Sequence, residues 1–435
     1  MTYDLIIIGS GPAGYVAAIR AGQTGLKTLI IDKKYVGGMC LNWGCIPTKS
    51  MLESAKLFAR IKGGAAEFGI GGFNPNELTF DWQQALKRNN KIIAKLTRGV
   101  EYLWKKNGVE FLKAEAKILS ANEVEANKSI FSTKHILIAT GSKPAKQDIF
   151  PLAIEIEDFF NLESLPLKPL ILGRGATMIE FAQLFILLGR TPTLVYTKLP
   201  LVPVLDAYLE AWVQKKLKKD KAVSIALEEL KIVDGKAYHG DKLLDYDAVI
   251  NCSRREAILP TSKLELKLDN GSIATDEYYR TSIPNIFAAG DVNGKSYLAH
   301  AASAQGNRVI DFIHGDNIVE PVNYPINIYS EPEIAQIGLT EQELKAKGTE
   351  YQSREFSLAA NGKALAEGAS EGFIRLLFEP KYQQVLGVQI VSANATDLIA
   401  EAGLLMELEG TVYDLAKTVH AHPTIAEIFM DVAQE

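Results

Sequence analysis

The pattern of hydrophobic positions divides the chain into two similar units and a third of different character. A continuous apolar run over Leu5–Ile8 predicts a strand buried on both faces, and a helical pattern continues to Ala21. A second apolar run, Thr28–Ile31, predicts the next strand. The same order of strand, helix and strand returns about 160 residues later, in Pro169–Leu172, Ile179–Leu188 and Thr193–Tyr196. The sequence therefore predicts two α/β domains of one design.

The remaining segments complete these domains and add a third. Phe80–Lys106 has the period of a long amphipathic helix, and His135–Ala139 and Ile286–Ala289 are short apolar strands. From Pro321 onward, short strands alternate with helices. The predicted strands are Ile326–Tyr329, Gly372–Phe378 and Val385–Val391, and the predicted helices are Glu341–Lys347, Ala395–Leu408 and Thr424–Val432. This order predicts an α+β domain at the C-terminal end.

Composition excludes several classes of partner. The chain of 435 residues has 47 basic and 52 acidic side chains and no long basic block, so nucleic acid is not an expected partner. Every apolar stretch is shorter than the roughly 18 residues of a membrane span, and we expect neither a signal peptide nor a transit segment. The three cysteines indicate a cytoplasmic protein without structural disulfides. A close cysteine pair in that setting is typically catalytic or metal-binding.

A glycine-rich turn joins the first predicted strand to the first helix. The motif Gly9-x-Gly11-x-x-Gly14 is weak alone, but here Asp32 stands at the end of the second strand, 18 residues after the last glycine. The first glycine permits the turn, the second lets a pyrophosphate approach the backbone, and the third lets the helix pack on the strand. The helix N-terminus favours phosphate charge, and Asp32 can accept hydrogen bonds from an adenosine ribose. This unit is predicted to bind a dinucleotide.

Two cysteines, Cys40 and Cys45, stand close to a predicted helix start. Such a pair can close a small disulfide ring, and a helix N-terminus lowers the pKa of a thiol and so favours exchange. A zinc site would need further ligands, and Cys252 and the six histidines show no usable spacing. No metal site is therefore predicted. Two inert core cysteines remain the other alternative.

The segment GGMCLNWGCIPTK, Gly37–Lys49, resembles the active-site motif of the class I pyridine nucleotide–disulfide oxidoreductases, most closely their dihydrolipoamide dehydrogenase branch. Glutathione and mercuric reductases share the scaffold but usually carry valine at the position of Leu41. The similarity runs nearly end to end and includes Ala139–Ser142, Ile286–Asp291, Leu298–Ala301, Tyr329–Glu333 and His420–Glu427.

The resemblance implies an α/β fold with two Rossmann-like nucleotide-binding domains, for FAD and for NAD(P), and an α+β C-terminal dimerisation domain. The expected FAD-binding domain comprises residues 1–148 and 269–317. The NAD(P)-type domain is expected at 149–268 and the dimerisation domain at 318–435. The implied assembly is a homodimer.

The resemblance also implies roles at the redox site. Cys40 would attack the substrate disulfide, and Cys45 would lie against the flavin as the charge-transfer thiol. Lys49 would lie near the reactive edge of the flavin. The residues expected to bind FAD are Gly9, Gly11, Gly14, Asp32, Gly38, Lys49, Ala116, Thr140, Gly141, Asp291 and Ala299.

Disulfide exchange needs a thiolate and must reprotonate a leaving thiol, so it needs an acid/base. The resemblance gives this role to His422, oriented by Glu427. Pro423 fits the first position of a helix, which would place His422 at the cap. The other histidines that we considered, His420, His300 and His314, are expected to be structural.

The second nucleotide unit departs from the family pattern. Gly173 and Gly175 are present, but Met178 stands where the third glycine belongs and would crowd the helix against the strand or the nucleotide. Tyr196 stands where NAD-binding members have an acid, and it cannot offer the two acceptor oxygens that a ribose diol prefers. NADP-binding members place arginines just beyond, where this chain has only Lys198.

A third motif of that unit, normally Gly-Arg-x-Pro-Asn, is changed to Ser253–Ala257, SRREA. Glu180, which the family places beside the nicotinamide and the flavin, is retained. Weak or absent NAD(H) binding and a diverged but working NAD site are both open, because backbone amides bind much of a pyrophosphate.

The function indicated is oxidation of a protein-bound dihydrolipoyl group through a Cys40–Cys45 disulfide to FAD and then to NAD. One alternative keeps this chemistry with a non-nicotinamide or protein electron partner. A second is a non-catalytic FAD-binding assembly subunit, against which the retained Cys40, Cys45, His422 and Glu427 argue. The expected partners are a second copy of the chain and a lipoyl-carrying protein or a small dithiol or disulfide.

Overall fold

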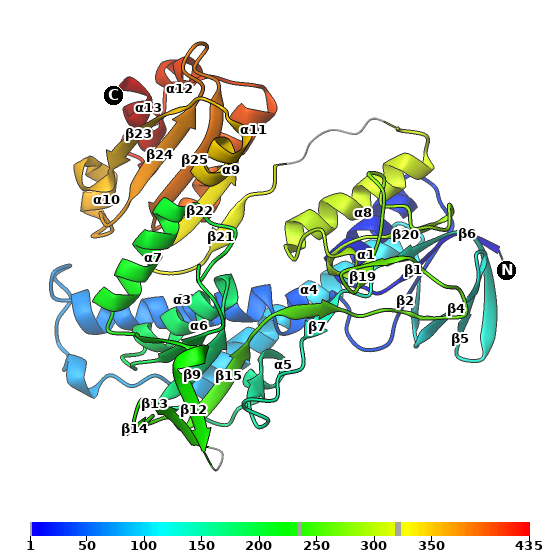
Figure 1. Cartoon of the computed structure of the whole chain (residues 1–435), viewed down its shortest axis with the longest axis horizontal. Helices are drawn as coiled ribbons and strands as arrows, with labels where there is room; N and C mark the ends of the chain where they lie inside the picture. Colours follow the sequence, from blue (N-terminus) through cyan, green and yellow to red (C-terminus); the bar gives the residue numbers. More distant parts are fainter. Residues whose placement is uncertain (1, 234–235, 318–322) are drawn as a thin grey trace.

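The computed structural model describes residues 2–233, 236–317 and 323–435, which form three parts, each built on a sheet (Figure 1). In the first part, parallel strands lie side by side: β1 (Thr2–Ile8), β2 (Thr28–Asp32), β6 (Ser129–Ile138) and β20 (Ile286–Ala288). Leu5, Ile6 and Ile7 are fully buried, as predicted for a strand covered on both faces. Two helices, α1 (Pro12–Gln23) and α8 (Ala299–Ile313), pack against each other beside this sheet. A late segment of the chain thus completes the first sheet.

The second part is a five-stranded parallel sheet in the order β11-β10-β9-β15-β8. Its strands are β8 (Ile154–Glu155), β9 (Pro169–Gly173), β10 (Thr193–Tyr196), β11 (Val223–Ala226) and β15 (Ala248–Cys252). The helix α6 (Ala176–Leu187) joins β9 to β10, and α7 (Ala207–Lys219) precedes β11. All residues of α6 from Met178 to Phe185 are buried, because the helix lies between its own sheet and α3 (Cys45–Gly64) of the first part.

The third part is an antiparallel sheet in the order β21-β22-β25-β24-β23, seen at the upper left of Figure 1. Its strands are β21 (Ile326–Ile328), β22 (Glu333–Gly338), β23 (Gln352–Ser357), β24 (Phe373–Phe378) and β25 (Val385–Ser392). Helices α9 (Glu341–Lys347), α11 (Ala395–Glu407) and α13 (Ile428–Gln434) belong to this part. The predicted start of this domain at residue 318, and Pro321, lie outside the described residues.

The α/β class with two Rossmann-like sheets and an α+β C-terminal part is confirmed. One predicted boundary is wrong. The last helix does not begin beside Pro423, because Thr424 forms a capping box with Glu427, and a short η5 (Ile425–Glu427) precedes α13. Thr424, and not His422, is therefore the capping residue.

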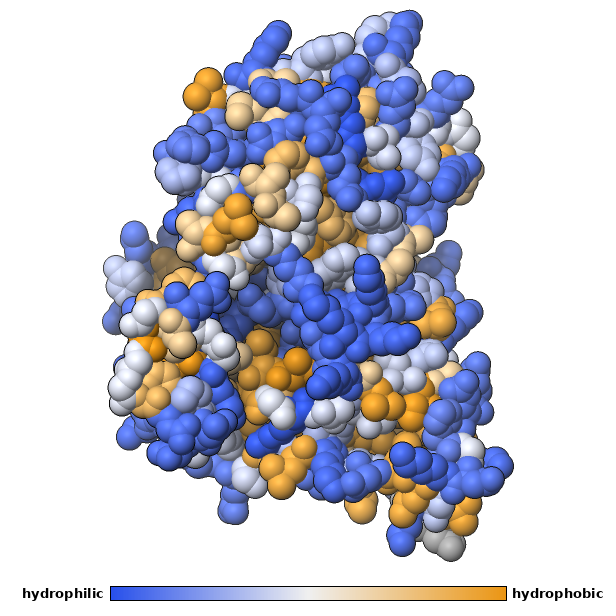
Figure 2. All heavy atoms as spheres, turned by 90° about the vertical axis from the view of Figure 1, so that its left-hand side faces the viewer, coloured by the Kyte–Doolittle hydropathy of each residue, from blue (hydrophilic) through white to orange (hydrophobic). Residues whose placement is uncertain are grey.

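The long helix α3 crosses between the first and second parts and contacts both α6 and α4 (Trp82–Lys106). It follows the short α2 (Gly38–Asn42) directly. Among the described residues, no helix combines the length and the apolar character that crossing a membrane requires. On the face shown in Figure 2, hydrophilic and hydrophobic residues are interspersed.

Candidate active site

The first glycine turn forms an open cradle. A Cβ atom on Gly9 would lie 2.2 Å from the Ala139 carbonyl oxygen, and one on Gly14 would lie 1.9 Å from the Gly9 carbonyl oxygen. A Cβ on Gly38 would lie 2.7 Å from Gly11 Cα, whereas one on Gly11 would meet nothing within 4 Å. The backbone is therefore tightly packed around Gly9, Gly14 and Gly38, whereas the space next to Gly11 is open, as the approach of a pyrophosphate requires.

Asp32 ends β2 beside this turn. Its Oδ2 accepts hydrogen bonds from the Ser10 amide at 2.7 Å and the Ser10 hydroxyl at 2.8 Å, and its Oδ1 accepts from the Lys34 amide at 2.8 Å. Because a carboxylate has about four lone-pair positions, Asp32 can order the turn and still accept from a ribose hydroxyl. The open cradle and this carboxylate fit the adenosine diphosphate half of FAD.

The ends of two neighbouring strands bring the next predicted FAD residues together. Thr140 and Gly141 follow β6, and Asp291 follows its parallel neighbour β20. Asp291 is half-buried and accepts a hydrogen bond from the Ser142 hydroxyl. Burial raises the pKa of Asp291, against the opposing effects of Ser142 and the nearby Arg255 guanidinium. Of the other predicted residues, Ala299 is the first residue of α8 and Ala116 is buried in β4 (Ala116–Ser120).

The two cysteines lie on consecutive helices, Cys40 in α2 and Cys45 as the first residue of α3. Both are half-buried thiols in this structure. A hydrogen bond from Cys40 lowers the pKa of Cys45, burial opposes this, and the charge of Lys49 adds to the lowering. The same hydrogen bond and burial raise the pKa of Cys40. The hydrogen bond and the Lys49 charge therefore favour Cys45 over Cys40 as the thiolate of the pair.

Lys49 lies one helical turn after Cys45 on the same face of α3. Its ammonium Nζ is 2.7 and 2.9 Å from the two carboxylate oxygens of Glu180, a buried residue of α6. Burial acts to lower the pKa of Lys49, but the charges of Glu180 and Cys45 outweigh it and raise that pKa. The backbone amide of Tyr329, from the third part, also donates to Glu180, at 3.2 Å. Three parts of the chain thus hold a cation beside the thiolate.

His422 lies in the third part. Its Nδ1 is 2.9 Å from Glu427 Oε1, and its side chain is 81% exposed. The Thr424 amide, and then His422, lower the pKa of Glu427, so that Glu427 is a carboxylate that orients the ring. Figure 1 places α13 at the top of the molecule, well away from α3. The structure therefore pairs His422 with Glu427 but does not bring it to the cysteine pair of the same chain.

The three histidines expected to be structural have internal contacts or cap a helix. His420 is 2.8 Å from Glu401 and stacks on Phe429, His300 Nε2 is 2.9 Å from the Pro325 carbonyl oxygen, and His314 ends α8. These positions agree with structural roles.

The second glycine turn differs from the first. A Cβ on Gly173 would lie 2.2 Å from the Cys252 carbonyl oxygen, which resembles the packing of Gly9. The Gly175 amide, however, donates to the Leu201 carbonyl at 2.6 Å, and Glu210 in turn holds the Leu201 amide at 2.6 Å. The corresponding Gly11 amide makes no such bond within the described ranges. An amide that could face a pyrophosphate is thus used internally.

Met178 is fully buried in the core between the second sheet and α3, and Tyr196 at the end of β10 packs against the same core. The helix α6 remains regular and packs on β9. The core therefore accommodates the methionine without crowding the helix against the strand, and the alternative, crowding of the nucleotide, stays a prediction. What the turn loses is the bare backbone of a third glycine.

Arg255, in the altered third motif, is a residue whose role the sequence did not indicate. Its Nε donates to the Ser142 hydroxyl at 2.8 Å and its Nη2 to the Ser142 carbonyl at 2.6 Å. Its guanidinium lies 5.7 Å from the ring of Trp43, between the two cysteines. Pairing of β16 (Arg255–Ala257) with β7 (Ser142–Pro144) positions it, and this long-range pairing leaves no local sequence signal. The altered motif therefore contacts Ser142, which is the hydrogen-bond partner of the predicted FAD-binding residue Asp291.

Two cysteines at the junction of α2 and α3, between a dinucleotide cradle and the Lys49 ammonium, are the arrangement of a flavin-dependent dithiol–disulfide oxidoreductase. Residues 3–306 match the family described as Pyridine nucleotide-disulphide oxidoreductase, and residues 324–433 match the dimerisation domain of that family. The chain belongs to this family, whose cofactors are FAD and NAD.

Named relatives cover the whole chain. It is 36% identical to a dihydrolipoyl dehydrogenase of Mycoplasma genitalium, over 100% of this chain and 98% of the relative. It is 35% identical to the dihydrolipoyl dehydrogenase of Geobacillus stearothermophilus, over 99% and 95% of the two chains. The solved structure of LpdA from Mycobacterium tuberculosis has the same fold, with a TM-score of 0.88 at 21% identity over 99% of both chains.

Proposed function

We propose that the protein oxidises a dihydrolipoyl group carried by another protein, through the Cys40–Cys45 pair to FAD and then to NAD. The observation that carries this proposal is the placement of Cys40 in α2 and Cys45 at the start of α3, one helical turn before Lys49, which Glu180 holds. The relatives named dihydrolipoyl dehydrogenase support the choice of substrate. Steady turnover of dihydrolipoamide by the purified protein tests the proposal, and its absence would favour a non-catalytic FAD-binding subunit.

The cysteine chemistry follows from the geometry. One substrate thiolate attacks the sulfur of Cys40 in the oxidised pair, forms a mixed disulfide and releases Cys45 as the thiolate that Lys49 stabilises. The second substrate thiolate attacks the substrate sulfur of the mixed disulfide, closes the substrate disulfide and releases Cys40. His422, oriented by Glu427, takes up the proton of the first substrate thiol, and the proton of the second passes to the released Cys40 sulfur. FAD, when bound, accepts the two electrons of the dithiol and so restores the Cys40–Cys45 disulfide.

The site is shared between subunits in this proposal. The matched dimerisation domain supports a homodimer, and the exposed ring of His422 is available to the cysteine pair of a second copy. The domain boundaries that we propose remain 1–148 with 269–317, 149–268 and 318–435. A cytoplasmic location is part of the same proposal.

The FAD contacts that we propose extend from Gly9, Gly11 and Gly14 through Asp32 to Asp291, with Arg255 added. We expect one FAD per chain in the purified protein. Arg255→Gln removes a guanidinium charge near Asp291 and two hydrogen bonds to Ser142, so we expect FAD binding to weaken by about 1–3 kcal/mol. Release of fluorescent FAD during dilution measures this, with the exposed neighbour variant Arg254→Gln as control. Equal FAD retention in both variants would remove Arg255 from the site.

The electron partner is the point at which this chain differs from its family. We expect NADH to reduce the flavin much more slowly than a dithiol does, because Tyr196 lacks the acid's two oxygens and the Gly175 amide is already bonded. Loss of the ribose contact alone costs about 1–3 kcal/mol, or about 5–150-fold in affinity. Rapid reduction by low-micromolar NADH would contradict this.

Met178→Gly combined with Tyr196→Glu is expected to strengthen NADH binding, with coupled effects because both positions frame the same half of the nucleotide. Stopped-flow reduction of the flavin measures it. If the double variant is no faster than the unmodified protein, the observed bond between Gly175 and Leu201 favours a second candidate function. That function is the same dithiol chemistry with a non-nicotinamide or protein electron partner.

A further inference from the structure

The helix α3 carries a second lysine on the same face as the redox residues. Cys45, Lys49, Glu53 and Lys56 follow one another at spacings of four, four and three residues, which places them on one face of a helix. Lys49 and Lys56 are therefore two turns apart, about 10.5 Å along the axis. One extended segment can contact both lysines.

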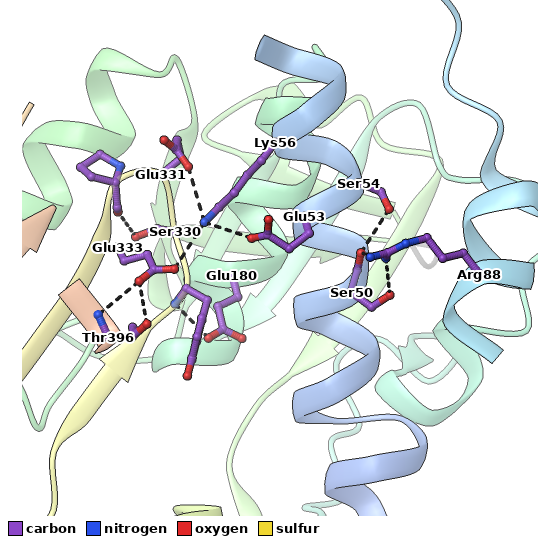
Figure 3. Close-up of polar contacts among 12 residues, drawn as sticks. Ser50, Glu53, Ser54, Lys56, Arg88, Glu180, Ser330, Glu331, Glu333 and Thr396 are labelled. Carbon is purple, nitrogen blue, oxygen red and sulfur yellow. Dashed lines mark hydrogen bonds and ion pairs between the residues drawn. The ribbon is translucent and has the colours of Figure 1, made fainter. Parts of the chain in front are cut away.

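The segment that does so is Tyr329–Glu333, which connects β21 to β22 in the third part. The Tyr329 ring lies 4.5 Å from Lys49 Nζ. Glu331 and Glu333 each place a carboxylate oxygen 3.5 Å from Lys56 Nζ. An extended chain advances about 3.3 Å per residue, so the two to four residues from Tyr329 to these acids cover most or all of the distance between the lysines. Figure 3 shows Lys56 between Glu53 on one side and Glu331 and Glu333 on the other.

Three acidic side chains surround the Lys56 ammonium. Its side chain is 15% exposed, and its Nζ lies 3.6 Å from Glu53 as well as 3.5 Å from Glu331 and Glu333. Glu333 is buried, and its Oε2 accepts from the Thr396 hydroxyl at 2.6 Å and the Thr396 amide at 3.2 Å. In the part of the chain that the structure describes, Lys56 is the one cation within ion-pair distance of Glu333. Removal of its amine leaves three carboxylates facing one another, which repels the segment from α3.

We propose that Lys56 is a positioning residue of the redox site. By holding Glu331 and Glu333 against α3, it keeps Tyr329 over Lys49 and so keeps the Lys49 ammonium beside Cys45. The effect reaches the thiolate through the backbone of a single segment, because the Tyr329 amide also donates to Glu180, the partner of Lys49. The proposal rests on the proposed dithiol function, but its main test does not depend on the identity of the dithiol.

That test is the pH dependence of the long-wavelength thiolate-to-flavin absorbance after two-electron reduction with dithiothreitol. The groups around Cys45 are Cys40 from α2, Lys49 on α3, Glu180 from α6 and Tyr15 from α1. Lys56→Met loosens Lys49, so the thiolate is less stabilised and the band is expected to appear at a pH about one unit higher. A purely structural loss would lower stability without moving this transition.

Turnover gives a second readout. We expect Lys56→Met to lower kcat about tenfold with little change in KM, because misplacing a reacting group slows the chemistry and Lys56 lies away from the substrate. Lys56→Arg should restore both the band and kcat. Lys62→Gln, an exposed position on the same helix, should change neither.

A folded Lys56→Met protein with an unshifted band would overturn the proposal, whatever its turnover. If Lys56→Met does not fold, Glu331→Gln weakens the same clamp at a side chain that is 43% exposed, and it should shift the band in the same direction by a smaller amount. An unshifted band in that variant would also overturn the proposal. If the unmodified protein does not turn over dihydrolipoamide but the band of Lys56→Met still shifts, the result counts against the proposed substrate alone.

Discussion

Replacement of His422 by alanine is expected to lower dithiol turnover by about 10²–10⁴-fold, the usual range for loss of an acid/base. The ring pairs with Glu427 at 2.9 Å and is otherwise exposed, so its removal leaves no cavity and no unpaired buried group. FAD content and thermal stability should therefore not change. Steady-state turnover of dihydrolipoamide measures the effect.

Two controls separate catalysis from folding. Glu427→Gln retains an acceptor for the ring but removes the charge, so it should lower turnover less than His422→Ala does. Heterodimers that combine one His422→Ala chain with one Cys45→Ser chain should recover part of the activity, because one of their two shared sites is intact. The absence of any recovery would show that the site is built within one chain.

The two cysteine variants are expected to differ sharply in colour. Cys45→Ser should abolish the long-wavelength thiolate-to-flavin band, whereas Cys40→Ser should show it without any reductant, since the Cys45 thiolate is then never trapped in a disulfide. Both variants should lose dihydrolipoamide turnover, because disulfide exchange needs both sulfurs. Absorbance spectra of the purified proteins, at matched FAD content, make the comparison. Similar spectra for the two variants would show that the roles are misassigned.

The band of Cys40→Ser also reports a pKa. The hydrogen bond from position 40, which a serine hydroxyl can also donate, lowers the pKa of Cys45, and the charge of Lys49 adds to this lowering. We therefore expect the thiolate, and with it the band, to persist below the ordinary range of a cysteine. Because the pKa of Cys45 is lowered, the band is present above that pKa and is lost as pH falls through it. The additional variant Lys49→Met should move the loss of the band to higher pH.

Much of the fold could be predicted because its local patterns agree with its long-range packing. Leu5–Ile8 and Thr193–Tyr196 are short, largely apolar runs. Because parallel sheets bury both faces of their strands, this hydrophobic pattern predicted both strands. The glycine turn, Asp32 and the Cys40–Cys45 motif were equally accessible, since each is a short run whose chemistry fixes its spacing.

The remainder depended on contacts between segments far apart in the sequence. Arg255 lies beside Ser142 because β16 pairs with β7, and Lys56 meets Glu333 because the third part lies along α3. The local hydrophobic pattern carries no information about these long-range contacts. The predicted cap of the last helix was wrong for a different reason. Pro423 and Thr424 are both typical of a helix start, and in the structure the capping box of Thr424 with Glu427 sets that start. The bond between Gly175 and Leu201 likewise depends on a loop whose path the sequence does not specify.

The most direct test of a flavin-linked dithiol site is an anaerobic titration of the oxidised protein with dihydrolipoamide, followed by flavin absorbance. We predict that the first two electrons per FAD produce the long-wavelength thiolate-to-flavin band while the flavin remains oxidised, because the electrons then reside on Cys40 and Cys45. Direct bleaching of the flavin without that band, or no change in absorbance at all, would contradict the account.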